Sequence, residues 1–113
     1  MDTVLSETEN FLSVHGINDK RAGRVRLAVE ELVLNVINYG GDGLKHLELR
    51  IVLKEDAIMI AIRDDGVLFD HSVFTYAGRP DIPGGQGLEL VRKTALSFEY
   101  RPVLGMNRTL LTY

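Results

Sequence analysis

The sequence predicts one α+β domain, a two-layer α/β sandwich with helices on one face of a mostly antiparallel sheet. Three observations favour this fold. Two segments with the apolar spacing of helices come first, two pairs of strand-like segments follow, and helical spacing returns between those pairs. A chain of 113 residues is long enough for one such core, so the predicted domain covers residues 1–113.

The start of the chain predicts two helices. Residues 4–14 have the pattern of a short amphipathic helix, which His15-Gly16 ends. Asn18-Asp19 then provides an N-cap for a long helix over roughly residues 19–39, and Gly40-Gly41 stops it. The apolar positions of the long helix indicate that it is largely buried; they are Val25, Leu27, Ala28, Leu32, Val33, Val36 and Ile37.

An antiparallel hairpin is predicted next. Apolar and polar residues alternate over 47–54, the segment Lys54-Glu55-Asp56 turns the chain, and a second alternation follows up to Arg63. The inward-facing apolar residues of this hairpin are Leu47, Leu49, Ile51, Leu53, Ile58, Ile60 and Ile62.

The remaining segments predict one helix and two more strands. Residues 67–85 have no clear period, and a connection this long in a small domain is usually functional or mobile. Strands at 98–101 and 109–113, joined around Gly105, complete the predicted sheet. Before them, helical spacing is carried by Leu88, Leu90, Val91 and Ala95.

Composition excludes several classes of protein. The net charge is −3 without a Lys/Arg cluster, so we expect no nucleic-acid partner. No apolar run approaches the about 20 residues of a membrane helix, so we expect no membrane insertion, and the acidic N-terminus is wrong for a signal peptide. With no cysteine, disulfides and thiolate metal sites are excluded, and a cytoplasmic location is the default expectation.

The long helix carries polar residues among its apolar ones. Glu31 and Asn35 lie four residues apart and therefore on one face, and Asn38 and Tyr39 follow one turn later. Burying a carboxylate or an amide without a partner costs about 1–3 kcal/mol. This face is therefore offered to a wet cavity, a ligand or partners elsewhere in the chain. Taken alone, such a pair is more often a solvated glutamate and a satisfied core amide.

Two further segments stand out. Asp64-Asp65-Gly66 ends an apolar strand, where a carboxylate is held at the rim of the sheet. Gly84-Gly85-Gln86-Gly87-Leu88 opens directly into a helix, whose free N–H groups and positive potential suit phosphate. Each segment alone is more often a turn or a flexible joint. The common phosphate motifs are absent, and the three histidines lack the spacing of metal ligands.

In this order and spacing, the three segments resemble the boxes of the GHKL (Bergerat-fold) ATP-binding superfamily, and within it most closely the anti-sigma-factor serine/threonine kinases. Residues 28–35 resemble the N-box, residues 64–70 the first glycine box and residues 85–93 the second. The resemblance covers about residues 5–113. It implies that the predicted sandwich is a Bergerat ATP-binding fold.

The resemblance also implies roles for individual residues. Asn35 would coordinate a Mg²⁺ ion that bridges the phosphates of ATP, and Glu31 would be the general base for the attacking hydroxyl. Asp64 would accept a hydrogen bond from the adenine amino group, and Gly66 would let the base lie flat against the backbone. The other expected nucleotide-binding residues are Asn38, Tyr39, Gly85, Gln86, Gly87, Leu88 and Thr109, while residues 69–85 would form a short lid.

The sequence departs from the family pattern in several places. Leu68 stands where many members have glycine or proline, and Tyr39 stands where these kinases tend to have histidine. In the family, a threonine on the last strand usually helps to hold adenine. Thr109 is the candidate for this position, and a register shift of one residue would place Leu110 there instead. The family usually opens with a strand before its first helix, so we expect either a naturally short version or a piece of a longer protein.

Two functions follow from the resemblance. The first is a serine/threonine kinase that phosphorylates a small anti-anti-sigma (STAS-like) protein and regulates a sigma factor. The second is a nucleotide-gated binding module that sequesters a regulator with little or no phosphotransfer. The catalytic half of a sensor histidine kinase is less favoured, because the sequence has no helix pair with a phosphoacceptor histidine. Whether the domain forms a homodimer stays open.

Overall fold

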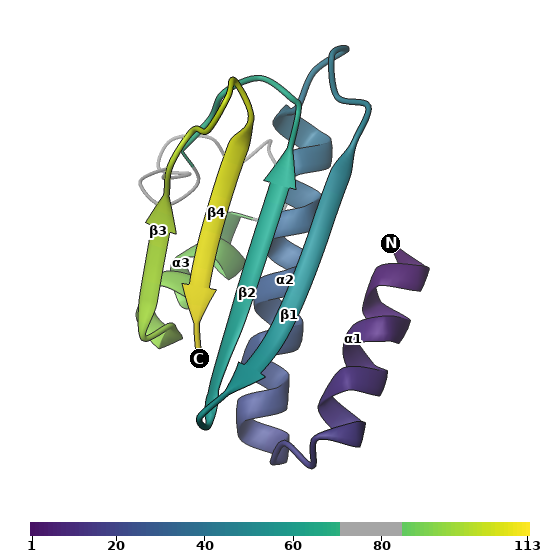
Figure 1. Cartoon of the computed structure of the whole chain (residues 1–113), viewed down its shortest axis with the longest axis vertical. Coiled ribbons are helices and arrows are strands. Elements are labelled where there is room, and N and C mark those ends of the chain that lie inside the picture. The colour runs from purple at the N-terminus through teal and green to yellow at the C-terminus, as the bar shows by residue number, and fades with distance from the viewer. Residues whose placement is uncertain (71–84) are drawn as a thin grey trace.

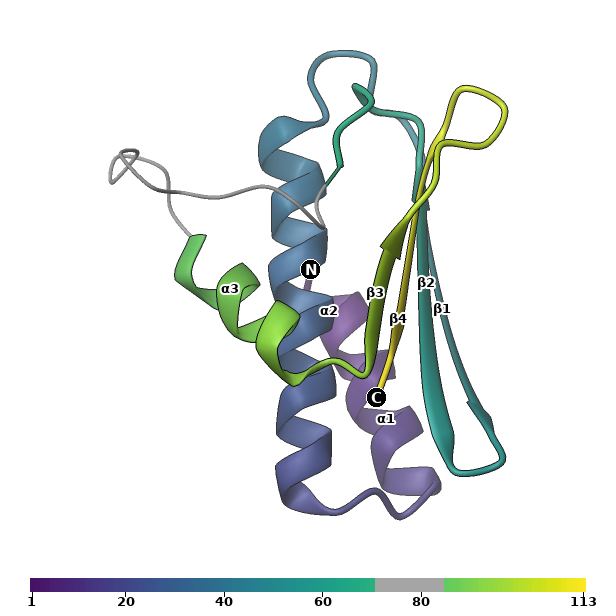
Figure 2. The ribbon, with the colours of Figure 1, turned by 90° about the vertical axis from the view of Figure 1, so that its left-hand side faces the viewer.

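The described chain forms a sheet with all of its helices on one face. The computed structural model describes residues 1–70 and 85–113, and in these ranges it contains three helices and four strands (Figures 1 and 2). The helices are α1 (Asp2–Val14), α2 (Asp19–Tyr39) and α3 (Gly85–Thr94). The strands are β1 (Leu47–Lys54), β2 (Ala57–Asp64), β3 (Ser97–Tyr100) and β4 (Asn107–Thr112).

The strands lie in the order β1-β2-β4-β3, and every neighbouring pair is antiparallel. The predicted α+β sandwich is therefore confirmed. β3 and β4 begin at Ser97 and Asn107, slightly earlier than the sequence pattern indicated. None of the described helices combines the length and the apolar character that crossing a membrane would need.

Local sequence sets the ends of α2. The side chain of Asn18 accepts a hydrogen bond from the backbone N–H of Arg21 at 2.9 Å, which confirms the predicted N-cap. Contrary to the prediction, Ile37 is 53% exposed. Each helical residue advances by about 100°, which carries Ile37 beyond the buried stripe that ends with Val33 and Val36.

Both hairpins turn through residues with positive φ. Glu55 and Asp56 have φ values of +52° and +72°, the signs that a two-residue type I′ turn requires. This turn fixes the register in which Lys54 pairs with Ala57. Leu104 and Gly105, with φ values of +54° and +78°, turn the second hairpin inside the bridge between Val103 and Met106.

The hydrophobic core lies between α2 and the inner face of the central strands. Alternate residues of β2 point into it, while the matching residues of β1 are only half-buried because β1 is an edge strand. α3 adds Leu88 and Val91, whereas Leu90, expected on the helical stripe, is 48% exposed. The fully buried core side chains include Val25, Val29, Leu32, Ile58, Ile60, Ile62, Leu88, Val91 and Leu111.

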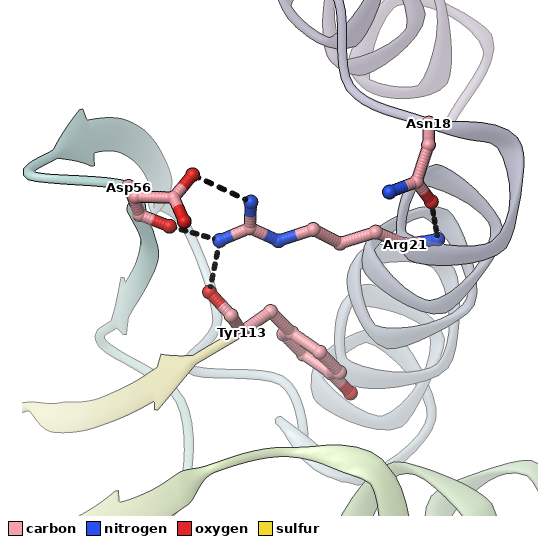
Figure 3. A network of polar contacts seen from close by, with 4 residues as sticks. All are labelled: Asn18, Arg21, Asp56 and Tyr113. Atoms are coloured by element: carbon pink, nitrogen blue, oxygen red, sulfur yellow. Dashed lines mark hydrogen bonds and ion pairs between the residues drawn. The ribbon is translucent and has the colours of Figure 1, made fainter.

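One arginine ties the two layers together near the start of α2 (Figure 3). The guanidinium of Arg21 forms an ion pair with Asp56 at 3.4 Å and also donates to the backbone oxygen of that residue. It donates a further hydrogen bond to the backbone oxygen of Tyr113 at 2.8 Å. Arg21 therefore joins α2 to the β1–β2 turn and to the residue that follows β4.

Candidate functional site

The polar flank of α2 places Glu31 and Asn35 at the boundary between core and surface. Asn35 is 3% exposed, and Glu31 is partly exposed one turn earlier. Burial raises the pKa of Glu31 above its ordinary value of 4.5, and the negative charge of Glu30 raises it further. A carboxylate with a raised pKa is a better proton acceptor, which suits a general base.

The first turn of α3 packs directly against Glu31. A β-carbon on Gly87 would lie 2.2 Å from Cδ of Glu31 and 2.3 Å from its Oε1, so a larger residue does not fit without displacement. The absence of a side chain at Gly87 thus leaves room for the Glu31 side chain between α3 and α2. The structure thereby brings together two segments that the sequence showed only as separate motifs.

The buried carboxylate of Asp64, at the end of β2, uses only one of its two oxygens in hydrogen bonds with the described residues. Asp64 is 2% exposed, and its Oδ1 accepts hydrogen bonds from the backbone N–H of Gly66 at 3.0 Å and from Nδ2 of Asn107 at 2.9 Å. Within residues 1–70 and 85–113, Oδ2 takes part in no hydrogen bond. Such an oxygen can accept a hydrogen bond from an amino group of a ligand.

Asn107, which the sequence analysis missed, uses all of its side-chain hydrogen-bonding capacity here. Its Oδ1 accepts from the backbone N–H of Phe69 at 2.9 Å and from the Tyr100 hydroxyl at 2.5 Å, and its Nδ2 also donates to the backbone oxygen of Val67 at 2.8 Å. It therefore fixes both Asp64 and the segment after β2. No sequence signal pointed to it, because the predicted strand began at residue 109 and asparagine is depleted in strands.

Two glycines bring the end of α2 against the end of β2. A β-carbon on Gly66 would lie 2.7 Å from Cα of Gly40, so only glycine permits this backbone approach. The backbone N–H of Val67 donates to the oxygen of Gly40 at 2.9 Å. The neighbouring Asp65 turns away from Asp64 and accepts from the backbone N–H groups of Lys45 and His46 at 2.8 and 2.9 Å.

The register of β4 places Thr109 on the same face as Asp64. Thr109 pairs with Ile62, one same-face position along from the Asp64–Asn107 pair, and is 2% exposed. Leu110 points to the opposite face of the sheet, because side chains alternate along a strand. Of the two alternatives, the structure therefore places Thr109 beside the candidate site.

The other predicted site residues differ in how they are placed. The ring of Tyr39 stacks on that of Phe69, with centroids 5.2 Å apart, while Asn38 is exposed. Leu88 is 1% exposed and belongs to the core, so only its backbone is available to a ligand. Gly85 and Gln86 form the first residues of α3. Most of the predicted lid, including Gly84, lies outside the described residues.

Among the described residues, no group of three or more His, Cys, Asp or Glu side chains could hold a metal ion. A metal ion beside Asn35 would therefore need most of its ligands from elsewhere. Phosphate oxygens and water are the usual remaining ligands of Mg²⁺, and one amide oxygen fits such a set.

Comparison with known families agrees with this arrangement. The profile of the histidine kinase-like ATPase domain matches residues 1–112. The chain therefore belongs to the histidine kinase-like ATPase domain family, a class of ATP-binding domain with this kind of α+β sandwich. A comparison with curated proteins found none that matches the chain.

Proposed function

We propose that this domain is a regulatory serine/threonine protein kinase of the anti-sigma-factor type. It transfers the γ-phosphate of ATP to a serine or threonine of an anti-anti-sigma (STAS-like) partner, and through that partner acts on a sigma factor. The observation that carries this proposal is the contact between Gly87 and Glu31. It sets the candidate base beside the helix N-terminus that would receive phosphate.

Each residue has a role that its environment supports. Oδ2 of Asp64 accepts from the adenine amino group, and Asn107 keeps that carboxylate in place. The free N–H groups of the first turn of α3 bind the phosphates. ATP supplies the phosphoryl group, and Mg²⁺ held at Asn35 supplies charge neutralisation. Glu31 accepts the proton of the attacking hydroxyl, helped by its raised pKa.

The nucleotide site is tested by thermal unfolding with ATP and Mg²⁺. Ligand at 100 times its Kd should add about 2.7 kcal/mol of stability, which is several degrees in a domain of this size. We expect Asn35→Ala to lose this shift or to make it independent of Mg²⁺. Lys20→Ala, at an exposed position near the start of the same helix, is the control and should keep the shift. Asn38→Ala is measured separately, as a test of the predicted role of Asn38. An absent shift in the wild type would contradict the proposal.

One observation favours the nucleotide-gated binding module instead. The carboxyl group of Glu31 lies so close to Gly87 that a β-carbon would not fit between them, which narrows the space for an attacking hydroxyl on that side. Labelled-phosphate transfer to a candidate STAS-like protein separates the two functions. The kinase predicts transfer that Glu31→Gln abolishes, whereas the binding module predicts ATP-dependent association without a labelled partner.

A further inference from the structure

No described helix covers the outer face of the sheet, and this face is basic. All three described helices lie on the other face, as the edge-on view shows (Figure 2). Five basic and two acidic side chains occupy the outer face of the strands and the β3–β4 loop, and all seven are exposed. They carry a net charge of +3 in a chain whose total is −3. These residues, which we call the basic face, are Glu48, Arg50, Lys54, Arg63, Glu99, Arg101 and Arg108.

The fold does not explain this concentration of charge. Arg63 of β2 lies directly opposite Arg108 of β4, and like charges in that position destabilise a sheet. Arg63 is compensated on its other side by an ion pair with Glu48 at 2.9 Å. Arg50, Arg101 and Arg108 form no ion pair with any residue in the described ranges. Three guanidinium groups are therefore available to an outside partner.

The basic face is hollowed on both sides of Arg108. One hollow, of about 240 Å³, lies over the small side chain of Ala61 between Arg50 and Arg108. Its apolar wall comes from the β3–β4 turn, where Leu104 is 97% exposed. A second hollow, of about 420 Å³, lies between Arg108 and Arg101. Each hollow combines guanidinium groups at its rim with apolar surface.

We propose that the basic face is a docking surface for an acidic polypeptide segment. Carboxylates of the segment pair with Arg50, Arg101 and Arg108, and an apolar side chain enters the hollow over Ala61. Apolar walls and the interspersed Glu48 and Glu99 favour a polypeptide over nucleic acid, whose closely spaced phosphates would meet both glutamates. Since this face is opposite the candidate nucleotide site, both can be occupied at the same time.

The test uses the full chain and a labelled probe. The probe is a fluorescein-labelled, glutamate-rich twelve-residue peptide that carries two leucines, and binding is measured by anisotropy at low and physiological salt. We expect the double variant Arg50→Glu/Arg108→Glu to weaken binding by about tenfold or more. The matched control is Lys20→Glu/Arg24→Glu, which changes the total charge equally at exposed positions of α2. We expect it to bind like the wild type.

Other probes decide between classes of ligand. A peptide with both leucines replaced by serine should bind more weakly, whereas a twelve-nucleotide thymidine strand and vesicles with one third phosphatidylserine should not compete. Equal losses in the two double variants, equal binding of the serine peptide, or stronger binding of the oligonucleotide or vesicles would overturn the proposal. Asn35→Ala should leave peptide binding unchanged, so this test is independent of the nucleotide site.

Discussion

Asn107 donates a hydrogen bond from Nδ2 to Oδ1 of Asp64, 2.9 Å away, across the β2–β4 pair. Both side chains are almost completely buried. The pair joins a position that the family resemblance identifies as adenine-binding to one that no motif indicated. The proposed nucleotide site therefore includes a side chain from the last strand as well as the three boxes.

Replacing Asn107 by aspartate should destabilise the fold. An aspartate has no Nδ2 group, so the two hydrogen bonds that Asn107 donates to Asp64 and to the backbone oxygen of Val67 are lost. The new carboxylate also faces the buried carboxylate of Asp64. We expect a loss of roughly 2–4 kcal/mol in the free energy of unfolding at neutral pH, measured in urea. A variant as stable as the wild type at pH 7 would contradict this network.

Gly87→Ala should damage the nucleotide site, because its β-carbon overlaps the carboxyl group of Glu31. Because the flexible Glu31 side chain can move aside, we expect a stability change below about 1 kcal/mol, but nucleotide affinity weakened by about tenfold, since the carboxyl group is displaced. Gly23→Ala is the matched control, since this glycine lies inside α2 with open space around it. It should gain about 0.5–1 kcal/mol from helix propensity and keep its affinity. Equal behaviour of the two variants would argue against close packing of α3 on Glu31.

Glu31→Gln should be more stable than the wild type at neutral pH. Because the pKa of Glu31 is raised on folding, the folded state favours the protonated form, and stability falls as pH rises from 4.5 through the folded pKa. The neutral amide avoids this loss. Urea unfolding at several pH values should show a gain at pH 7 that disappears below pH 4.5. A destabilised variant at pH 7 would show that the carboxylate makes favourable contacts.

Asp65→Asn should remove a pH-dependent part of the stability. The backbone N–H groups of His46 and Lys45 hold the pKa of Asp65 below its ordinary value of 3.8. The carboxylate therefore stabilises the fold above pH 3.8, and this contribution is lost as pH falls through the lowered pKa. We expect the variant to be less stable at pH 7 and to approach the wild type at the acid end of a urea series. A constant difference at every pH would contradict the assignment.

The sequence predicted the elements better than their contacts. Apolar periodicity and the Asn18 cap located α2 to the residue, since both are local signals. Periodicity failed at Ile37 and Leu90, because each helix carries more apolar residues than its buried face holds. These two side chains therefore lie outside that face. The close approaches at Gly66 and Gly87 join segments far apart in the chain. No local pattern contains them.

The candidate site was predictable in outline for a related reason. Motif spacing identified Glu31, Asn35 and Asp64, because each stands in a short, ordered segment. Asn107 stands in no motif, and three of its four partners lie about forty residues away, so only the strand register reveals it. The choice of Thr109 over Leu110 likewise required the pairing of β2 with β4.

The two ends of α2 are fastened to the sheet in different ways, with a mechanical consequence. At its start, the long side chain of Arg21 binds Asp56 in the hairpin turn and the backbone oxygen of Tyr113 after the last strand. These contacts oppose sliding of the helix layer along the sheet. At its other end, about 30 Å away along the helix, Gly40 and Gly66 meet backbone to backbone without interlocking side chains. A side chain at Gly66 would therefore push the end of α2 away from the end of β2, whereas a change at the Arg21 end would remove polar contacts without forcing the layers apart.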